Sequence, residues 1–324
     1  MKRKLGLIAA TTFIFLAFSA CGNNDNQTHE NSSVMQSEQS EASEKESGED
    51  FIVDGIRQES ENVFCITSKE GLFNFNKAVN GYERFNFPHG YFRDSIIRLE
   101  TDINYDAQWE CIVDTTGTLQ GATFDGNGHY ISGLEYVGGA EISNNPPIGF
   151  FGAIASDFTI QNLTLKNCGM RTDKGKWAGV VVGYHTQSAL AVKNVTIDSC
   201  YLSYSTMETV GSKKIGGIIG FSQDQRWGGY GLIIEGCTIK NSNLSGYISV
   251  GGIGGSIFYY MDTEYAQTIS IKNNLVQNCV FNVSKSNIES VYANQEISPY
   301  DIEKSEAFFK SLGNFQEGNH YNVI

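Results

Sequence analysis

Five acidic residues lie in the segments that separate the repeated parts of this chain. They are Asp157, Asp173, Asp224, Asp262 and Glu264. Two carboxyl groups that face one cleft can hydrolyse a glycosidic bond, because one protonates the leaving oxygen while the other activates water or attacks the sugar. Acidic residues in the loops of an acidic chain are, however, most often solvated surface groups. Glycoside hydrolysis is therefore kept as an alternative interpretation.

Polysaccharide elimination would need basic side chains beside acids that hold calcium. Arg171, Asp173, Lys174 and Lys176 are close in sequence and form the best such group. None of the five histidines has a serine or cysteine partner in a recognisable motif. His129 follows a turn and is interpreted as structural. We therefore predict no catalytic residues.

The aromatic residues of the separating segments favour binding over catalysis. Aromatic faces flanked by polar groups suit sugar rings and protein contacts alike. We expect Phe221 and Phe258 to be buried beneath the loops. The candidate ligand-binding residues are Tyr184, His185, Trp227, Tyr230, Tyr259, Tyr260 and Tyr265.

These candidates are positioned by a unit that recurs four times. The units are FTIQNLTLKNCGM (158–170), LAVKNVTIDSCYL (190–202), LIIEGCTIKNSNL (232–244) and ISIKNNLVQNCVF (269–281). Each follows a glycine cluster, and such clusters suit tight corners or a close approach of two backbones. Alternation within each unit slips at Asn162, Asn194, Gly236 and Asn273. This pattern predicts strands that turn a corner in the coil of a β-solenoid, with the units stacked on one another.

The insert after each glycine cluster lengthens along the chain. The inserts at 153–159, 184–191, 221–233 and 256–270 have 7, 8, 13 and 15 residues. Insertions at one fixed point of a repeat emerge from one face, which is often the binding face. We therefore expect the aromatic candidates to share one side of the molecule.

The cysteines follow the same repeat. Cys168, Cys200, Ser242 and Cys279 share one column, and Cys237 shares another with Leu163, Val195 and Asn274. Stacked parallel strands hold equivalent side chains ~4.8 Å apart, which is wider than a disulfide prefers. We expect mostly free, buried thiols. We expect no metal and no cofactor, because there is no C-x-x-C motif and no histidine partner.

The N-terminal segment is typical of an exported lipoprotein. Lys2, Arg3 and Lys4 precede an apolar run from Leu5 to Ala20, which is shorter than the ~20 residues of a membrane span. Phe18-Ser19-Ala20-Cys21 resembles the lipobox of bacterial lipoproteins, which implies cleavage before Cys21 and lipidation of its thiol. Residues 21–50 are polar and acidic, so they predict a disordered tether.

The charge limits the partners. The chain carries −13 overall, and removing the +3 of the leader and the −7 of the tether leaves −9 on the remainder. An acidic surface argues against nucleic acid and against anionic polymers as strong ligands.

Ahead of the repeats, residues 67–80 are predicted to form a helix that caps the sheet, with Thr67 and Glu70 as a capping box.

Several segments together resemble bacterial GLUG-repeat surface proteins. The segments are ITSKEGLFNFNKAVN, RLETDINYDAQW, FDGNGHYISGL, and the repeated GG-x-x-G and NL-x-L-x-NC motifs. The tail segment SEAFFKSLGNF also resembles the helix-like closing segment of these chains. The resemblance covers about Cys65 to Phe281. It implies a short right-handed parallel β-helix, cell-surface display, and roles in adhesion or glycan contact. It carries no fixed catalytic residues.

The sequence therefore predicts an all-β, lipid-anchored, extracytoplasmic protein of the bacterial cell membrane. It would bind a glycan or a surface protein through one face, without catalysis. The alternatives are a polysaccharide lyase or glycoside hydrolase on the same fold, and a structural spacer. The expected organisation is a signal peptide (1–20), a tether (21–50), a cap with the first coils (51–134), GLUG-like repeats (135–287) and a closing segment (288–324).

Overall fold

The computed structural model describes residues of one compact unit, Gly48–Ile324, and the account below is of this unit. The described ranges are 53–82, 90–137, 146–172, 175–204, 213–223, 231–246, 249–258, 269–283, 295–296 and 313–323. Within them the chain is mostly β-strand with one helix, and the sheets are parallel. The predicted all-β class is confirmed. No helix of the described ranges has the length and apolar character needed to cross a bilayer.

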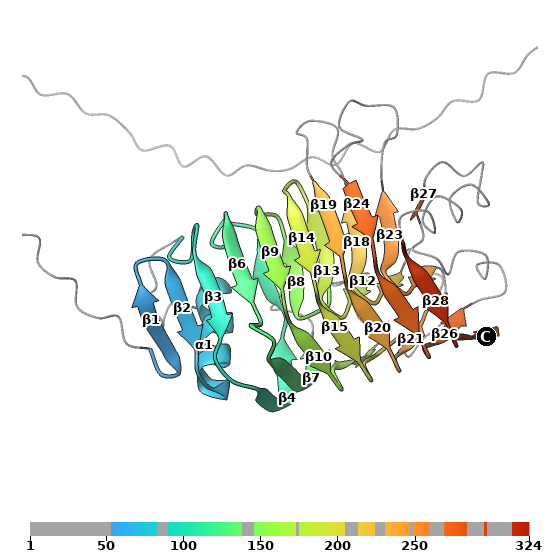
Figure 1. Cartoon of the computed structure of the whole chain (residues 1–324), viewed down its shortest axis with the longest axis horizontal. Coiled ribbons are helices and arrows are strands. Elements are labelled where there is room, and N and C mark those ends of the chain that lie inside the picture. The colour runs from blue at the N-terminus through green and yellow to red at the C-terminus, as the bar shows by residue number, and fades with distance from the viewer. Residues whose placement is uncertain are drawn as a thin grey trace, which may run out of the picture. The chain divides into compact units, whose positions relative to one another are not determined.

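One sheet, here called row A, receives one strand from each successive turn of the chain (Figure 1). Its first strand pairs with β1 (Ile56–Ser60), which runs antiparallel to it. Row A contains β2 (Val63–Ile66), β3 (Ile96–Leu99), β6 (Ala122–Asp125), β9 (Phe158–Gln161), β14 (Leu190–Lys193), β19 (Leu232–Glu235) and β24 (Ile269–Lys272).

The second sheet, row B, is built from two strands per turn. Both sets meet at β7 (Tyr130–Val137), which also pairs with β4 (Ile103–Glu110). The first set is β10 (Thr164–Lys166), β15 (Thr196–Asp198), β20 (Thr238–Lys240), β25 (Leu275–Gln277) and β28 (Phe315–Glu317). The second set is β11 (Gly169–Thr172), β16 (Tyr201–Tyr204), β21 (Asn243–Ser245), β26 (Val280–Val283) and β29 (His320–Val323).

Two further rows complete the turns that begin at β9, β14 and β19 before the chain returns to row A. Row D contains β12 (Trp177–Gly179), β17 (Lys214–Gly216) and β22 (Ser249–Gly251). Row C contains β5 (Ile112–Asp114), β8 (Phe151–Ile154), β13 (Val182–Thr186), β18 (Ile219–Gln223), β23 (Gly254–Phe258) and β27 (Gln295–Glu296).

The predicted repeat is in register in three dimensions. Leu190 pairs with Phe158 on one side and with Leu232 on the other, and Leu232 pairs with Ile269. Successive turns are therefore 32, 42 and 37 residues long (158 to 190, 190 to 232, 232 to 269). Equivalent apolar side chains stack inside, so one continuous core is buried.

The corners depend on residues that tolerate a left-handed backbone. Asn162, Asn194, Gly236 and Asn273 all have φ between 52° and 67°, as expected for the slip in the repeat. Asparagine and glycine adopt this conformation with the least strain. A second corner, which the sequence did not reveal to us, follows the first strand of row B. It uses Asn167, Ser199, Asn241, Asn278 and Gly318.

The glycine clusters let the backbone of row C lie directly against that of row D. A Cβ atom on Gly220 would lie 2.6 Å from the backbone N of Ala178, and one on Gly183 would lie 2.6 Å from the backbone N of Ile148. Side chains cannot be placed at such distances, so only glycine fits. The close approach predicted from these clusters is confirmed.

The predicted cap is the helix α1 (Lys69–Val79), which packs Leu72 and Phe75 onto the first turns of the core. The expected capping residue was wrong. Ser68 is the N-cap and its Oγ accepts from the Gly71 N–H at 3.2 Å. The Oγ of Thr67 instead donates to the Gly55 carbonyl. The extended backbone of Ser68 (φ −158°) turns its side chain towards the first helical N–H groups.

The structure describes the predicted closing segment (288–324) only in part. Its described residues extend row B by one more turn, because β28 pairs with β25 and β29 pairs with β26. Residues 305–312, which carry most of the helix-like pattern, lie outside the described ranges.

Candidate functional site

Rows C and D present a set of side chains at fixed offsets from the glycines. In row D, the outward position lies two residues before the first glycine of the cluster. In row C, it lies one residue after the last glycine of the cluster. In row D these positions are Trp177 and Lys214. In row C they are Tyr184 and Phe221, whose equivalents in the neighbouring turns, Ala153 and Ser256, are buried. The glycine-packed junction of the two rows thus places two columns of side chains next to each other.

Three rings from these columns stack on one another and are here called the aromatic cluster. The centroids of Trp177 and Tyr184 are 4.4 Å apart at an interplanar angle of 21°. The Phe221 centroid lies 5.1 Å from Trp177 and 5.8 Å from Tyr184, at angles of 27° and 13°. All three side chains are half-buried, so each ring keeps part of its surface accessible. The three nearly parallel rings therefore form a stack across two adjacent turns, and the part of each ring that stays accessible can contact the apolar surface of a ligand.

Two lysines lie at the cluster. The Nζ of Lys176 is 4.7 Å from the centre of the Trp177 ring, and the Nζ of Lys214 is 4.7 Å from that of Phe221. Lys214 Nζ also donates to Ser256 Oγ at 2.6 Å. Cation–π contacts of this kind hold the ammonium groups beside the ring faces. The cluster therefore combines apolar ring surface with fixed hydrogen-bond donors.

The predicted site residues do not all lie in one place that the structure describes. Tyr184 belongs to the aromatic cluster. Cys21, Trp227, Tyr230, Tyr259, Tyr260 and Tyr265 lie outside the described residues. In the sequence, Trp227 and Tyr230 come four and seven residues after the end of β18, which carries Phe221. The other three tyrosines come one, two and seven residues after the end of β23, which carries Ser256.

His185 lies inside the molecule. Only 3% of it is exposed, its Nδ1 is 2.9 Å from Ser222 Oγ, and its Nε2 is 2.9 Å from the Ser188 carbonyl. Burial lowers its pKa to about 4, so the ring is neutral at pH 7. Strand alternation explains the difference, because the supposed loop begins as strand β13, with Tyr184 outward and His185 inward. We leave His185 out of the site.

Trp177 was not among the residues we singled out, and Phe221 was expected to be buried. The signal was available, since both occupy the same offset from their glycine pair as Lys214 and Tyr184 do. The inserts were predicted to be loops from their first residue, so the shared offset was overlooked. In the structure, β8, β13, β18 and β23 continue into the inserts.

Of the five candidate acids, the structure describes Asp157. Its Oδ1 accepts from the Ala189 N–H at 2.7 Å and its Oδ2 accepts from Gln120 Nε2 at 2.8 Å. It borders a shallow groove of about 190 Å³ on the outer side of row A, lined mainly by glycine, alanine and apolar residues. No second carboxylate lines this groove, so it lacks the pair that hydrolysis requires. No group of metal-ligating side chains occurs among the described residues.

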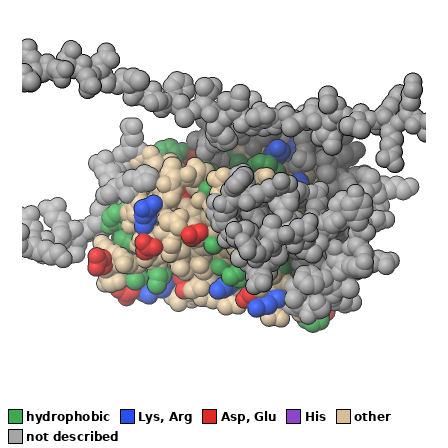
Figure 2. All heavy atoms as spheres, turned by 90° about the horizontal axis from the view of Figure 1, so that it is seen from above, with side chains coloured by type: hydrophobic (Ala, Val, Ile, Leu, Met, Phe, Trp, Pro, Cys, Tyr) green, Lys and Arg blue, Asp and Glu red, His purple; other side chains and the backbone are tan. Residues whose placement is uncertain are grey.

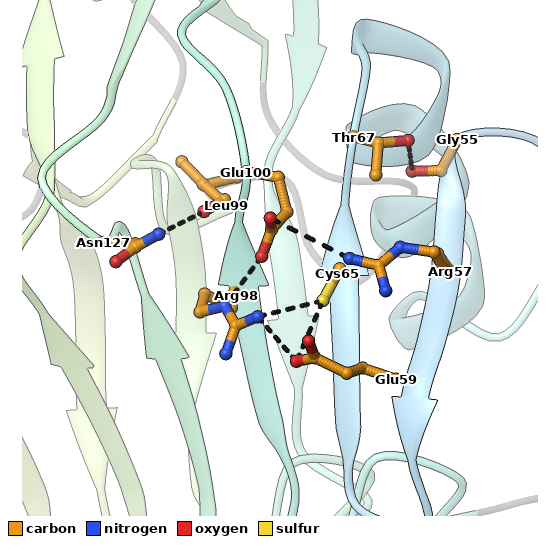
Figure 3. A network of polar contacts seen from close by, with 9 residues as sticks. All are labelled: Gly55, Arg57, Glu59, Cys65, Thr67, Arg98, Leu99, Glu100 and Asn127. Carbon is orange, nitrogen blue, oxygen red and sulfur yellow. Dashed lines mark hydrogen bonds and ion pairs between the residues drawn. The ribbon is translucent and has the colours of Figure 1, made fainter.

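A polar network covers the first strands of row A (Figure 3). Arg98 pairs with Glu59 at 2.6 Å and with Glu100 at 2.8 Å, and its Nη2 lies 3.6 Å from Cys65 Sγ. Burial raises the pKa of the Cys65 thiol to about 11, so this sulfur is protonated and a poor nucleophile. We interpret the network as support for the N-terminal end of the sheet.

No known protein family, characterised protein or solved structure matches this chain. The function of the chain is therefore inferred from the geometry above and from the sequence.

Proposed function

We propose that the chain is a lipid-anchored surface protein of a bacterium that binds a glycan through the aromatic cluster, without catalysing a reaction. The observation that carries this proposal is the stack of three half-buried rings with lysines beside it. Sugar rings present apolar C–H faces to such platforms and hydroxyl groups to the polar atoms at their edges.

We further propose that the fold is a short right-handed parallel β-helix of the GLUG-repeat kind. The turns that begin at β9, β14 and β19 pass through rows A, B, D and C before the chain returns one strand further along row A. This order and the regular register support a helical coil rather than a meander. The resemblance of the glycine clusters and of the corner motif to GLUG repeats supports it independently.

The anchor and the location rest on the sequence. The basic leader, its short apolar run and the lipobox-like Phe18-Ser19-Ala20-Cys21 favour export and lipidation at Cys21. An acidic tether would then hold the folded unit away from an anionic membrane surface. A glycan-binding domain needs such clearance to reach ligands beyond the membrane.

The test is a glycan array probed with the full-length chain, followed by titration of the best ligand. We expect Trp177→Ala to weaken binding roughly ten-fold or more, because a central aromatic anchor commonly contributes about 2 kcal/mol. Phe315→Ala is the matched control, since Phe315 is an exposed ring (61%) on β28. Equal effects of the two substitutions, or no glycan bound at all, would contradict the proposal; a protein partner or a spacer role would then be favoured.

A further inference from the structure

The groove on the outer side of row A follows from the residue types at one corner of the coil. The residues that immediately precede the strands of row A lie in register across four turns, because β6, β9, β14 and β19 pair residue by residue. These corner residues are Gly121, Asp157, Ala189 and Gly231. Two of them have no side chain and one has only a methyl group, so the corner is hollow, and all four line the groove.

The groove has an apolar floor and the size of a small ring. Its volume is about 190 Å³, which is below the roughly 300–1,000 Å³ of sites for drug-sized ligands. The side chains of Thr159, Ala191 and Ile233 are paired in register and line it. Paired strands place such side chains ~4.8 Å apart. The apolar face of a single sugar ring therefore fits against Ala191 and Ile233.

Asp157 supplies a fixed carboxylate at the edge of the groove. Its Oδ1 accepts from the Ala189 N–H at 2.7 Å, and its Oδ2 accepts from Gln120 Nε2 at 2.8 Å. Gln120 Oε1 in turn accepts from the Asp157 N–H at 3.3 Å. A carboxylate has about four acceptor sites, so each oxygen can accept one more hydrogen bond from a ligand.

The charge at the groove favours a cationic ligand group. The two donors to the Asp157 carboxylate are neutral, and none of the residues that line the groove is basic. An ammonium donates stronger hydrogen bonds to a carboxylate than a neutral hydroxyl or amide does. The folded unit carries −9, counted over residues 51–324, so its overall field also attracts a cation. An ammonium group on an apolar ring face is the chemistry of an amino sugar.

The groove and the aromatic cluster lie on the same turns of the coil. Tyr184 belongs to β13, and Ala189, which lines the groove, is five residues further along. Because a chain advances at most ~3.6 Å per residue, their Cα atoms lie within roughly 18 Å of each other. In the next turn, β18 carries Phe221 and β19 carries Ile233. One oligosaccharide of several sugars is long enough to contact both places.

We propose that the groove is a second subsite, which takes a glucosamine residue with a free amino group. The ammonium binds Asp157 and the ring face lies on Ala191 and Ile233, while the aromatic cluster holds another sugar of the same oligosaccharide. This inference rests on the proposed glycan-binding function and specifies its ligand class. Asp157 then discriminates glucosamine from N-acetylglucosamine, whose nitrogen is a neutral amide.

The experiment titrates the full-length chain with two oligosaccharides of equal length, one of glucosamine and one of N-acetylglucosamine, at a pH where the sugar amine is protonated. We expect the glucosamine ligand to bind roughly three- to five-fold more tightly, which is the effect of one exposed ion pair. Asp157→Asn should abolish this preference and leave the affinity for the N-acetylglucosamine ligand unchanged, because asparagine keeps an oxygen for the Ala189 N–H. Ala191→Leu, which fills the groove, should also abolish the preference.

Asp102→Asn is the matched control and should retain the preference. Asp102 is likewise exposed, its Oδ1 accepts the Tyr130 N–H at 3.1 Å, and it does not line the groove. A preference that persists in Asp157→Asn would overturn the inference. Equal affinity of the unmodified chain for both ligands, with both weakened in Trp177→Ala, would overturn it and leave glycan binding standing.

A lysine peptide of equal charge serves as a third probe. Tighter binding of this peptide than of the glucosamine ligand would show that the groove takes a protein side chain, and it would overturn the inference. Binding of neither oligosaccharide would overturn the inference and count against the proposed function as well. Thermal melting of each variant shows whether the fold is intact.

Discussion

At several corners of the described turns, the backbone N–H of a buried residue donates to a side chain of the next turn. The Cys168 N–H donates to Cys200 Sγ at 3.4 Å, and the Cys200 N–H donates to Ser242 Oγ at 3.1 Å. At the other corner, the Cys237 N–H donates to Asn274 Oδ1 at 2.9 Å. A thiol, a hydroxyl and an amide therefore perform the same task. This explains why the cysteines keep the phase of the repeat without forming disulfides.

The first prediction concerns these thiols. All six described cysteines are buried and free, namely Cys65, Cys111, Cys168, Cys200, Cys237 and Cys279. A thiol reagent should therefore label none of them in the folded protein and six per chain in denaturant without reductant, with Cys21 blocked by its lipid. Fewer labelled thiols in denaturant would show that some of them are paired.

The second prediction follows from the lowered pKa of His185. Its folded value of about 4 is below the unfolded value of 6.5, so the unfolded state binds the proton more readily. The stabilisation by the neutral ring is complete above about pH 6.5 and is lost as the pH falls towards 4. The loss is on the order of 3 kcal/mol for this shift.

Chemical denaturation between pH 7 and pH 4.5 measures this loss. We expect the variant His185→Gln to be less stable at pH 7 but to show a flatter pH dependence than the unmodified chain. His129→Gln is the control, because His129 is partly exposed and pairs with Asp102 at the surface. A variant of His185 whose pH dependence matches that of the unmodified protein would contradict the assignment.

At the scale of the elements, the contact between rows C and D depends on glycine. We predict that Gly220→Ala destabilises the fold by about 2 kcal/mol or more, because its Cβ would meet backbone atoms of Ala178 and Gly183 at 2.6 Å. Gly246→Ala is the matched control, since its Cβ would meet only the side-chain ends of Ile215 and Val250 at 3.0 and 3.1 Å. Denaturant unfolding measures the stability of both variants. Similar losses of stability would indicate that close backbone contact does not determine how rows C and D pack.

The sequence predicted the elements that repeat visibly and missed those that do not. The spacing of the apolar residues and the asparagine at the corner predicted rows A and B, because few other structures require these residue types at these positions. Rows C and D were interpreted as glycine corners with loops, since three-residue strands such as β12 are too short to show alternation. The strands of rows C and D are defined by their pairing with the equivalent strands of neighbouring turns. This pairing cannot be recognised within the sequence of a single turn.

The last turn was missed for a related reason. In GNFQEGNHYNV, Gly313 and Gly318 occupy the corner positions that asparagine holds elsewhere. Asn314 and Asn319 occupy the buried column positions, and they accept from the N–H groups of Asn274 and Cys279. Each replacement keeps the physical role while changing the residue type, so a search for NC at the corner does not find this turn.

At the scale of the whole molecule, the charges on the described part of one face are dispersed rather than collected. Acidic, basic and apolar side chains are interspersed on the described part of the face seen in Figure 2. Many of the charges on row A pair with one another, as Lys272 does with Glu235 at 3.0 Å. Such exposed pairs contribute little stability.

The last prediction concerns display of the whole chain. If Cys21 carries the lipid anchor, Cys21→Ala should release the folded unit from the cells into the medium, because the tether offers no apolar surface to hold it at a membrane. Fractionation of cells and medium, with detection by antibody, measures this. Asn23→Ala, two residues further along, is the control and should remain with the membrane. A processed Cys21→Ala protein that stays membrane-bound would show that another part of the chain provides the anchor. Glycan binding by the released protein would show separately that the aromatic cluster functions without the membrane.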